Sequence, residues 1–340
     1  MAKLGDYTVI KTGKLDANAS SENGKYPFFT CSVQPLKIDT YSYDCECVLV
    51  AGNGDLNVKY YNGKFDAYQR TYIIESVDKS VLTVPYMYCF LDKYVETLRQ
   101  QSIGGVIKYI KLGNLTDADI PLHSVENQNK IVSNLNKVTD LINKRKQQLE
   151  KLDELVKSRF LEMFGDVRTN SKGFKAKKGV ELFKISNGKA VPNDKRFENG
   201  IPAYGGNGIS WYTDDVLYEQ DTIVIGRVGF QSGNVHLVKG PIWITDNAMY
   251  ISEFYDDSLS LVFLCEMMEQ IDFTKQQDAG DLKKVTQKPF MEMKYILPPK
   301  NLQSNYIAFV SQTDKSKQQI QQSLEKLETL KKSLVQEYFG

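Results

Sequence analysis

The sequence predicts an α+β protein: two mostly β domains joined by two long antiparallel coiled-coil helices, in an internal duplication with pseudo-twofold symmetry. Two observations predict this fold. A helical segment occurs twice, as QLEKLDELVKSRFLEMFGD (148–166) and again as SLEKLETLKKSLVQEYFG (323–340). Each copy follows a stretch of short Val, Ile, Tyr and Phe runs broken by Gly, Asn and Asp, which is the composition of strands and hairpins.

The duplication extends into the globular segments. IKTGKLD (10–16) is matched by ISNGKAV (185–191), and the apolar run CVLVAGNGD (47–55) is matched by TIVIGRVGF (222–230). A repeat of this kind indicates that each half has the same order, a globular domain, a proline and a long helix. The predicted boundaries are 1–121 for the first domain, 122–165 for the first spacer helix, 166–298 for the second domain and 299–340 for the second spacer helix.

The spacer helices are predicted from two apolar seams with steps of three and four residues. The seam residues are Ile131, Leu135, Val138, Ile142, Leu149, Leu152 and Val156 in the first helix, and Ile320, Leu324, Leu327, Leu334 and Tyr338 in the second. Gly165 and Gly340 stand where a glycine commonly ends a helix. Two such helices in one chain pack most simply on each other, and the duplication predicts that they run antiparallel.

Composition argues against several classes of function. The chain has 41% hydrophobic and 25% charged residues, typical of globular proteins, and no apolar run long enough to predict a membrane span. The start MAKLGDYTVI lacks a signal-peptide pattern, and five scattered cysteines fit free thiols, so we expect a cytoplasmic location. Only two histidines are present, and there is no phosphate-binding loop or methyltransferase motif, so neither a metal site nor catalysis is predicted.

Three further stretches carry a family resemblance. They are the proline-containing helix starts IPLHSVENQNKIV (120–132) and ILPPKNLQSNYIAFV (296–310), and the segment LFKISNGKAVPNDKRFENGIPAYGG (182–206). Together with the helix ends FLEMFGD and VQEYFG, they make the whole chain resemble the specificity subunits of type I restriction-modification systems. The segment 182–206 is similar to the opening of a target recognition domain in that family.

The resemblance implies a non-catalytic reader of double-stranded DNA. Each target recognition domain would read one half of a bipartite target, and the helices would set the gap and dock two methyltransferase subunits. Restriction or translocase subunits would join some complexes. No cofactor is expected on this chain, because S-adenosylmethionine and ATP with magnesium would bind the partner subunits.

Candidate DNA contacts are polar residues in glycine-containing loops after apolar runs. Arg, Lys, Asn and Gln read base edges, while Ser, Thr, Tyr and Lys contact phosphates. The predicted contacts in the first domain are Asn53, Asp55, Asn57, Lys59, Tyr68, Gln69, Arg70, Gln101 and Ser102. Those in the second are Tyr204, Asn207, Trp211, Arg227, Gln231, Ser232, Asn234, Gln276, Gln277, Lys283 and Lys284.

A coiled-coil scaffold without a nucleic-acid role is the alternative. The net charge of +1 favours it, because DNA-binding proteins usually neutralise phosphates with an excess of Lys and Arg. The polar, glycine-rich loops with Tyr, Asn, Gln and Arg favour the DNA reader, since a scaffold does not need them. The target bases and the gap length do not follow from the sequence.

Overall fold

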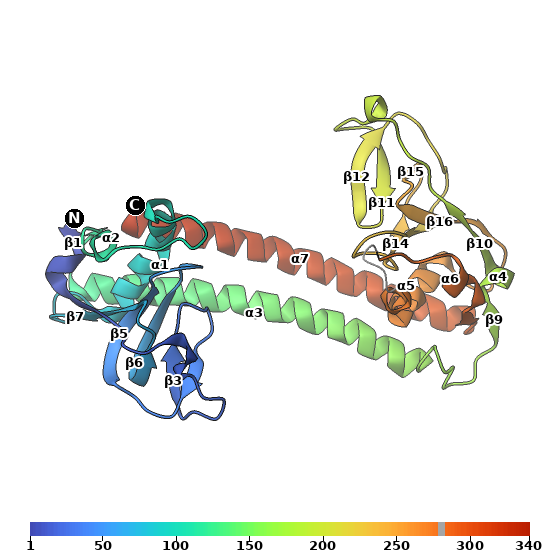
Figure 1. Ribbon diagram of the computed structural model, residues 1–340. Helices are drawn as coiled ribbons and strands as arrows, with labels where there is room; N and C mark the ends of the chain where they lie inside the picture. The colour runs from blue at the N-terminus through green and yellow to red at the C-terminus, as the bar shows by residue number, and fades with distance from the viewer. Residues whose placement is uncertain (278–282) are drawn as a thin grey trace. The chain divides into compact units, whose positions relative to one another are not determined.

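The computed structural model describes residues 1–277 and 283–340. The chain divides into two compact units: unit 1 contains Met1–Gln147 and Gln321–Gly340, and unit 2 contains Gln148–Ile320. Each unit holds a mostly β domain and part of each long helix, α3 (Val125–Phe164) and α7 (Lys300–Phe339) (Figure 1). The α+β fold class predicted from the sequence is confirmed.

Unit 1 is built around a six-stranded sheet in the order β2-β7-β5-β6-β3-β4. Its strands are β1 (Ala2–Lys3), β2 (Thr8–Thr12), β3 (Tyr26–Phe29), β4 (Leu36–Ile38), β5 (Tyr43–Ala51), β6 (Val58–Ala67), β7 (Thr71–Ser76) and β8 (Asp119–Ile120). Its shorter helices are α1 (Val84–Gln101) and α2 (Leu112–Thr116). All pairs in this sheet are antiparallel except β3 with β6.

The central strand β5 is buried on both faces. Val48 and Val50 pack in the core shared with α1, and Cys47 and Leu49 pack in a second core on the opposite face. Because side chains alternate across a strand, burial on both faces produces the continuous apolar run that the sequence shows here. The sheet curls so that the end of β6 lies beside the segment after β2, where Leu15 N donates to Ala67 O at 3.4 Å.

Unit 2 contains a four-stranded antiparallel sheet, β10-β16-β13-β14, and a three-stranded sheet, β12-β11-β15. Its strands are β9 (Ala176–Lys178), β10 (Phe183–Asn187), β11 (Ile201–Gly205), β12 (Gly208–Thr213), β13 (Thr222–Gly226), β14 (Val235–Val238), β15 (Trp243–Ile244), β16 (Ala248–Phe254) and β17 (Lys294–Ile296). Its helices are α4 (Gly179–Leu182), α5 (Leu261–Ile271) and α6 (Lys288–Glu292), and a 3-10 helix, η4, spans Phe273–Gln276.

Helix α5 is followed at once by the 3-10 helix η4. Helix α5 ends at Ile271 because Asp272 adopts a left-handed conformation with φ of 58°, and the chain continues as η4. A residue in this conformation is a common C-terminal cap. Helix α5 packs on the sheet beside β13 and β14, as α1 packs on the sheet of unit 1.

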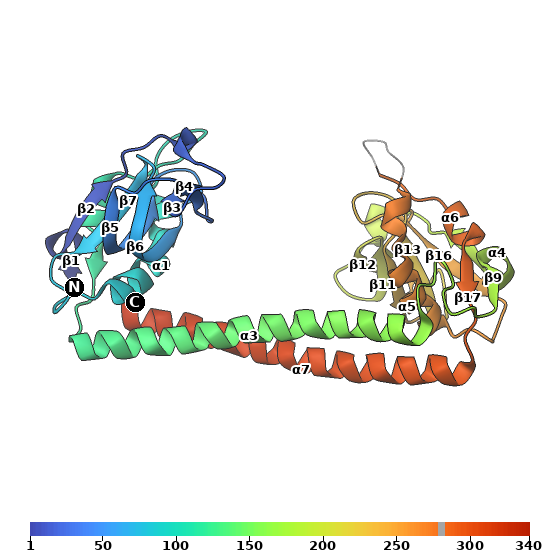
Figure 2. The same ribbon diagram turned by 90° about the horizontal axis from the view of Figure 1, so that it is seen from below.

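The long helices run antiparallel within each unit. In unit 1, Asn134 Nδ2 donates to Tyr338 Oη at 3.3 Å, and Lys146 Nζ lies 3.5 Å from Glu328 Oε1. The partner numbers on α7 therefore fall as those on α3 rise. Within each unit, the segments of the two helices lie next to each other in both ribbon views (Figures 1 and 2).

The same antiparallel order holds in unit 2. Lys317 Nζ lies 2.7 Å from Asp153 Oδ1, and the ring of Tyr306 lies 5.5 Å from that of Phe164. Of the predicted seam, the buried residues are Ile131, Leu135, Val138, Ile142, Val156 and Leu324. The half-buried ones are Leu149, Leu152, Ile320, Leu327, Leu334 and Tyr338.

The repeated Phe-Gly ending docks each long helix onto a domain helix. At the end of α3, the ring of Phe164 lies 4.7 Å from that of Phe263 on α5. At the end of α7, the ring of Phe339 lies 5.3 Å from that of Tyr86 on α1. All four side chains are buried, and each such ring contributes an apolar area that dominates local packing. The helix that starts in one half of the sequence thus ends in the core of the other half's domain.

Candidate nucleic-acid interface

Two loops meet beside the main sheet in each unit. In unit 1 they are residues 52–57, between β5 and β6, and residues 101–110, after α1; we call them the unit 1 loop pair. In unit 2 they are residues 227–234, between β13 and β14, and residues 276–277 and 283–285, at and after the end of η4; we call them the unit 2 loop pair. Positions 278–282 lie outside the described residues.

In the unit 1 loop pair, two backbone hydrogen bonds join the loops. Gly54 N donates to Lys108 O at 2.9 Å, and Ile110 N donates to Gly52 O at 2.9 Å. Between them Asn53 pairs with Tyr109 in a single antiparallel bridge. The backbone is therefore fixed at the point where the predicted Asn53 contact projects.

The unit 2 loop pair is held by the same bonds at the equivalent positions of the repeat. Gly229 N donates to Lys283 O at 2.8 Å, Val285 N donates to Arg227 O at 3.0 Å, and Val228 bridges the residue after Lys283. Backbone geometry is thus repeated in the two units while the side chains differ. A common scaffold that carries different side chains is what two different ligand sequences require.

Other predicted contacts of unit 1 lie around the same loops. Asn57 Nδ2 donates to Cys31 O at 2.8 Å, and its Oδ1 accepts a hydrogen bond from Lys59, whose pKa is lowered by burial. Asp55 is exposed and lies 3.5 Å from Arg99. Asn57 and Lys59 therefore also stabilise the loop.

The turn that contains Tyr68, Gln69 and Arg70 reaches the unit 1 loop pair through its backbone. Gly52 N donates to Arg70 O at 2.8 Å, which leaves the exposed side chains of Gln69 and Arg70 beside the loops. At the end of α1, Gln101 Oε1 accepts a hydrogen bond from Asn114 at 3.1 Å. Ser102 Oγ donates to Arg99 O at 2.7 Å and so caps the helix end.

In unit 2, Arg227 stands between two further turns. Its backbone N donates to Asn247 O at 2.9 Å, in the turn between β15 and β16. The hairpin tip that carries the exposed Asn207 packs against the same place, since a Cβ on Gly206 would lie 3.0 Å from Gly226 Cα. The structure therefore brings together the two turns that carry Asn207 and Arg227, as the sequence could not show.

Gln277, Asn234 and Gln231, three of the predicted contacts, stabilise the loop of residues 227–234. Gln277 Nε2 donates to Ser232 O at 2.7 Å and to Phe230 O at 3.2 Å, so its amide holds the loop. Asn234 donates to the side chain of Gln231. Ser232 is buried, and its Oγ has no hydrogen-bond partner among the described residues. Gln276, Lys283 and Lys284 are exposed.

Two predicted aromatic contacts lie outside the unit 2 loop pair. Tyr204, on β11, packs against a small core formed by residues such as Val224 and Ile244. Trp211, on β12, is half-buried, and Arg196 Cζ lies 4.1 Å from the centre of its ring. A cation at this distance stabilises the ring through its quadrupole.

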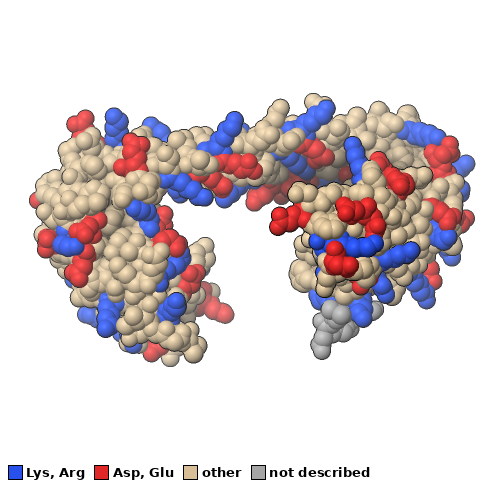
Figure 3. Space-filling model, turned by 90° about the horizontal axis from the view of Figure 1, so that it is seen from above, with Lys and Arg blue, Asp and Glu red and all other residues tan. Residues whose placement is uncertain are grey.

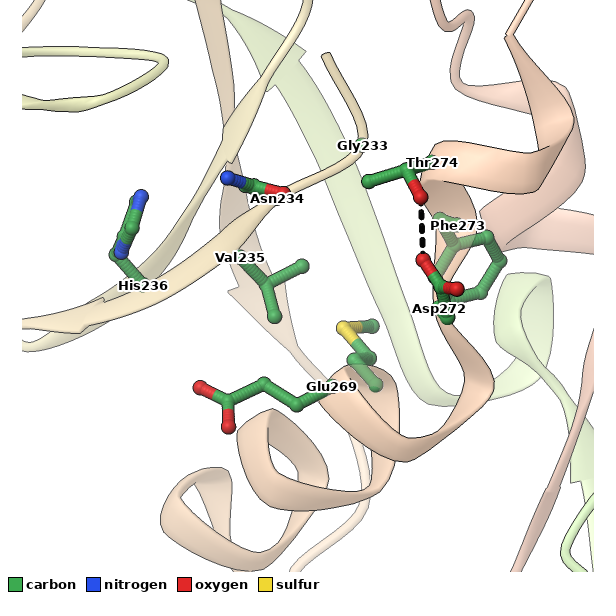
Figure 4. Close-up of a pocket in the computed structure, with 9 residues that line it drawn as sticks. Gly233, Asn234, Val235, His236, Glu269, Asp272, Phe273 and Thr274 are labelled. Carbon is green, nitrogen blue, oxygen red and sulfur yellow. Dashed lines mark hydrogen bonds between the residues drawn. The ribbon is translucent and has the colours of Figure 1, made fainter. Parts of the chain in front are cut away.

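A pocket of about 280 Å³ lies behind the unit 2 loop pair. One wall is the strand segment that includes Asn234 and His236, and the other is the end of α5 with Glu269 and Asp272 (Figure 4). Loss of solvent around the carboxyl and the nearby carboxylates of Glu266 and Asp314, against the opposite effect of Lys317, together raise the pKa of Glu269 to about 7. Glu269 therefore binds a proton more readily than an ordinary glutamate, whereas the pKa of Asp272, the other carboxyl group of the pocket, is lowered, mainly by its hydrogen bond from Thr274.

Sequence reasoning missed Phe230, which projects from the unit 2 loop pair and is 81% exposed. The signal was present, since a large apolar residue stands alone between glycines and polar residues in RVGFQSGN. It also missed Asn247, which the fold brings beside Arg227 from a distant turn. Among the described residues, no cluster of three or more His, Cys, Asp or Glu is arranged to hold a metal ion.

The family model described as the type I restriction modification DNA specificity domain matches residues 1–151 and again residues 171–329. The chain belongs to this family, which confirms both the resemblance and the internal duplication.

Individual relatives agree. The type I restriction enzyme EcoDI specificity subunit of Escherichia coli is 36% identical over 155 residues, which cover 46% of this chain and 34% of that protein. The match thus spans about a third of that relative's length. A putative type I specificity subunit of Mycoplasma genitalium is 22% identical over 309 residues, covering 84% of this chain and 77% of its own.

Solved structures have the same fold. The crystal structure of the type I restriction-modification system S subunit from M. genitalium superposes with a TM-score of 0.69 at 19% identity, covering 100% of this chain and 95% of that one. A structure from a study of complex assembly and conformational transition of the type I R-M system gives a TM-score of 0.62 at 14% identity. In the part of the chain that the structure describes, no helix is long and apolar enough to cross a membrane.

Proposed function

We propose that this chain is the DNA-recognition subunit of a type I restriction-modification complex, and that each loop pair reads one half of a bipartite double-stranded target. The observation that carries the proposal is the repeated backbone bonding at equivalent positions of the two halves, with Gly54 and Lys108 in unit 1 and Gly229 and Lys283 in unit 2. Base edges are read by side chains on a fixed backbone. Two equal scaffolds with unequal side chains therefore suit two different half-sites.

Two methyltransferase subunits are the proposed main partners, docked along the long helices. Leu155 and Leu330 occupy equivalent positions of the repeated helical segment, and they are 47% and 45% exposed. Equivalent exposed leucines on two helices suit two copies of one partner, because the same partner surface fits both. The reactions would then belong to the partners, which would bind S-adenosylmethionine and, in restriction or translocase subunits, ATP with magnesium.

Charge supports a role for these partners in DNA binding. The net charge is +1, and on the face shown in Figure 3 blue and red side chains are interspersed over both units. Phosphate neutralisation supplies most non-specific affinity for DNA. The isolated chain is therefore expected to bind DNA poorly and to gain affinity when a methyltransferase subunit is bound.

The proposal is tested by co-expressing the chain with its methyltransferase subunit and sequencing the methylated bases of the host genome. A bipartite methylated motif that appears only when both proteins are present would support it. A gel-shift of the purified complex on duplexes with and without that motif separates a reader from a scaffold. A complex that assembles but neither methylates a motif nor prefers any duplex would favour the scaffold.

A further inference from the structure

Phe230 is the most exposed aromatic side chain among residues 1–277 and 283–340. It lies in the unit 2 loop pair, where its neighbours in the chain are Gly229 and Gln231. Exposure of one large ring is unfavourable in water, because apolar surface gains free energy when it leaves solvent. An exposed ring within a polar loop is therefore available for an apolar contact that forms on binding.

The loop holds this ring on a rigid backbone. Gly226 N donates to Asn234 O at 2.9 Å, and Gly233 N donates to Gly226 O at 2.8 Å, which closes the loop at its base. The amide of Gln277 donates to the carbonyl of Phe230 itself at 3.2 Å. A group that is already ordered loses less entropy on binding than a mobile one.

Glycine is required at the base of the loop. Gly233 has φ of 95°, and a Cβ there would lie 2.7 Å from Phe273 C and Thr274 N, so the loop is seated directly on η4. The backbone of the loop is already in van der Waals contact with η4 at Gly233 and cannot move closer to it. The contact of Gly233 with η4 and the hydrogen bond from Gln277 to the Phe230 carbonyl together keep the Phe230 side chain directed toward solvent.

One cation lies over the ring, and two others belong to the same loop pair. Lys283 Nζ lies 5.4 Å from the centre of the Phe230 ring, and Arg227 and Lys284 belong to the same loop pair. Lys and Arg contact phosphates and guanines, whereas a phenyl ring has no hydrogen bond to offer a base edge. The apolar feature on a base edge in the major groove is the C5 methyl group of thymine.

We propose that Phe230 is a specificity-determining residue that contacts the C5 methyl group of one thymine in the half-site read by unit 2. This inference rests on the proposed function, because it requires that the unit 2 loop pair faces DNA. It adds an apolar contact to a loop from which sequence reasoning expected only polar ones. The half-site of unit 2 must therefore contain at least one A·T pair.

The test is a set of duplexes that carry the methylated motif of the assembled complex, each with one thymine of the unit 2 half-site replaced by deoxyuridine. Deoxyuridine keeps every hydrogen bond of thymine and lacks only the methyl group. For the wild-type complex, one replacement should raise Kd about fourfold, the value for one buried methyl group. In the Phe230→Ala complex, that same replacement should have no effect, and Kd on the unmodified duplex should be raised by at least as much.

Two variants control the experiment. Phe230→Leu keeps an apolar side chain and should retain part of the sensitivity to deoxyuridine. Tyr255→Ala removes an exposed aromatic ring (54% exposed) of unit 2 outside the loop pair, and it should behave as wild type. Methylation of the unit 1 half-site should stay selective in every variant, which shows that the complex is folded.

Three results would overturn the inference: a unit 2 half-site without A·T pairs, a wild-type complex indifferent to every replacement, or a Phe230→Ala complex that keeps the wild-type sensitivity. A ring that acts by unstacking bases would give the second result together with weaker binding of Phe230→Ala. Failure of the proposed function itself is distinct, since the wild-type complex would then show no preferred duplex.

Discussion

Gln128 Oε1 accepts a hydrogen bond from the backbone N of Thr83 at 2.8 Å, which ties the first turns of α3 to the N-terminus of α1. At the equivalent position of the second half, Gln303 Oε1 accepts from the backbone N of Ser260 at 3.0 Å, at the N-terminus of α5. Both glutamines are buried. The duplicated sequence therefore repeats one buried polar joint between spacer helix and domain.

Gln128→Met is expected to lower the free energy of unfolding by about 2–4 kcal/mol, because Gln128 Nε2 also donates to Val81 O and to His123 O and the variant leaves these buried groups without partners. Urea unfolding followed by circular dichroism measures the change. Gln147→Met, at an exposed position of the same helix, is the control and should change stability by less than about 0.5 kcal/mol. Equal stability of the two variants would show that the joint is not structural.

Stability is expected to fall as pH rises from about 4.5 to about 7, because of Glu269. Its pKa rises from 4.5 in the unfolded chain to about 7 in the folded one, so in this window the folded state binds more protons. The free energy of unfolding then decreases with increasing pH. Glu269→Gln should weaken this dependence, to which the raised pKa of Glu266 also contributes. It should stabilise the protein at pH 8 by about 1 kcal/mol, since solvent on the open side screens the effect.

Thermal unfolding of the wild type and of Glu269→Gln between pH 5 and pH 8 is the measurement. Glu198→Gln, at an exposed position of unit 2, is the matched control. A Glu269→Gln variant whose Tm follows pH as that of the wild type does would mean that Glu269 is ionised throughout the window.

Arg227→Ala is expected to relax specificity in the unit 2 half-site alone. Within residues 1–277 and 283–340, the guanidinium makes only a long contact of 3.5 Å with Asp246 O, so it is available for a bidentate contact with guanine. Such a contact contributes about 1–3 kcal/mol of discrimination. Methylome sequencing of the variant complex reads this out, with Lys239→Ala as an exposed control in unit 2. If both half-sites were methylated with unchanged selectivity, Arg227 would not be a base contact.

Leu155→Asp and Leu330→Asp are each expected to remove one methyltransferase subunit from the complex. A carboxylate at a docked leucine would be buried without a partner, which is strongly unfavourable. Native mass spectrometry counts the subunits, and the double variant should bind none. Ser158→Asp adds the same charge at another exposed position of α3 and should leave the count at two. Full occupancy in the double variant would place the docking surface elsewhere.

The length of the long helices is expected to set the unread gap in the target. Four inserted residues add about 6 Å to a helix, whereas one base pair advances DNA by about 3.4 Å. A matched insertion in α3 and α7 should therefore lengthen the gap by one or two base pairs and leave both half-sites unchanged. A length series is needed, because each added pair also rotates the second half-site by about 35°.

The ion pairs between α3 and α7 indicate other insertion points than the sequence does. The sequence alone favours positions after Lys144 and after Gln319, at equivalent places in the two copies. Lys146, however, pairs with Glu328, and Asp153 pairs with Lys317. Lys144 and Gln319 therefore do not face each other, and insertions after them would shift the register of one helix against the other in the stretch between them. Insertions after Gln147 and after Gln322 lie between these ion pairs on both helices. If active variants of this kind still methylated sites with the original gap, the helices would not determine it.

Much of this fold is determined by local sequence pattern. The period of the apolar residues predicts α3 and α7, and the continuous apolar run around Val48 predicts a strand buried on both faces. The repeat then implies that both halves have the same order of a globular domain and a long helix. The loops that carry the predicted DNA contacts also follow from the sequence, because glycine and polar residues after a buried strand indicate a hairpin.

Only the tertiary structure decides which of these loops meet and which side chains remain free. Gln277 and Asn57 are predicted base contacts in the sequence, and in the structure their amides donate to backbone carbonyls of neighbouring segments, those of Ser232 and Cys31. The two turns that carry Asn207 and Arg227 are brought together by a close approach of Gly206 and Gly226 that no local pattern encodes. The reason is physical: helix and strand periods are set by neighbours along the chain, whereas hydrogen-bond partners and exposure are set by residues far apart in sequence that packing brings together.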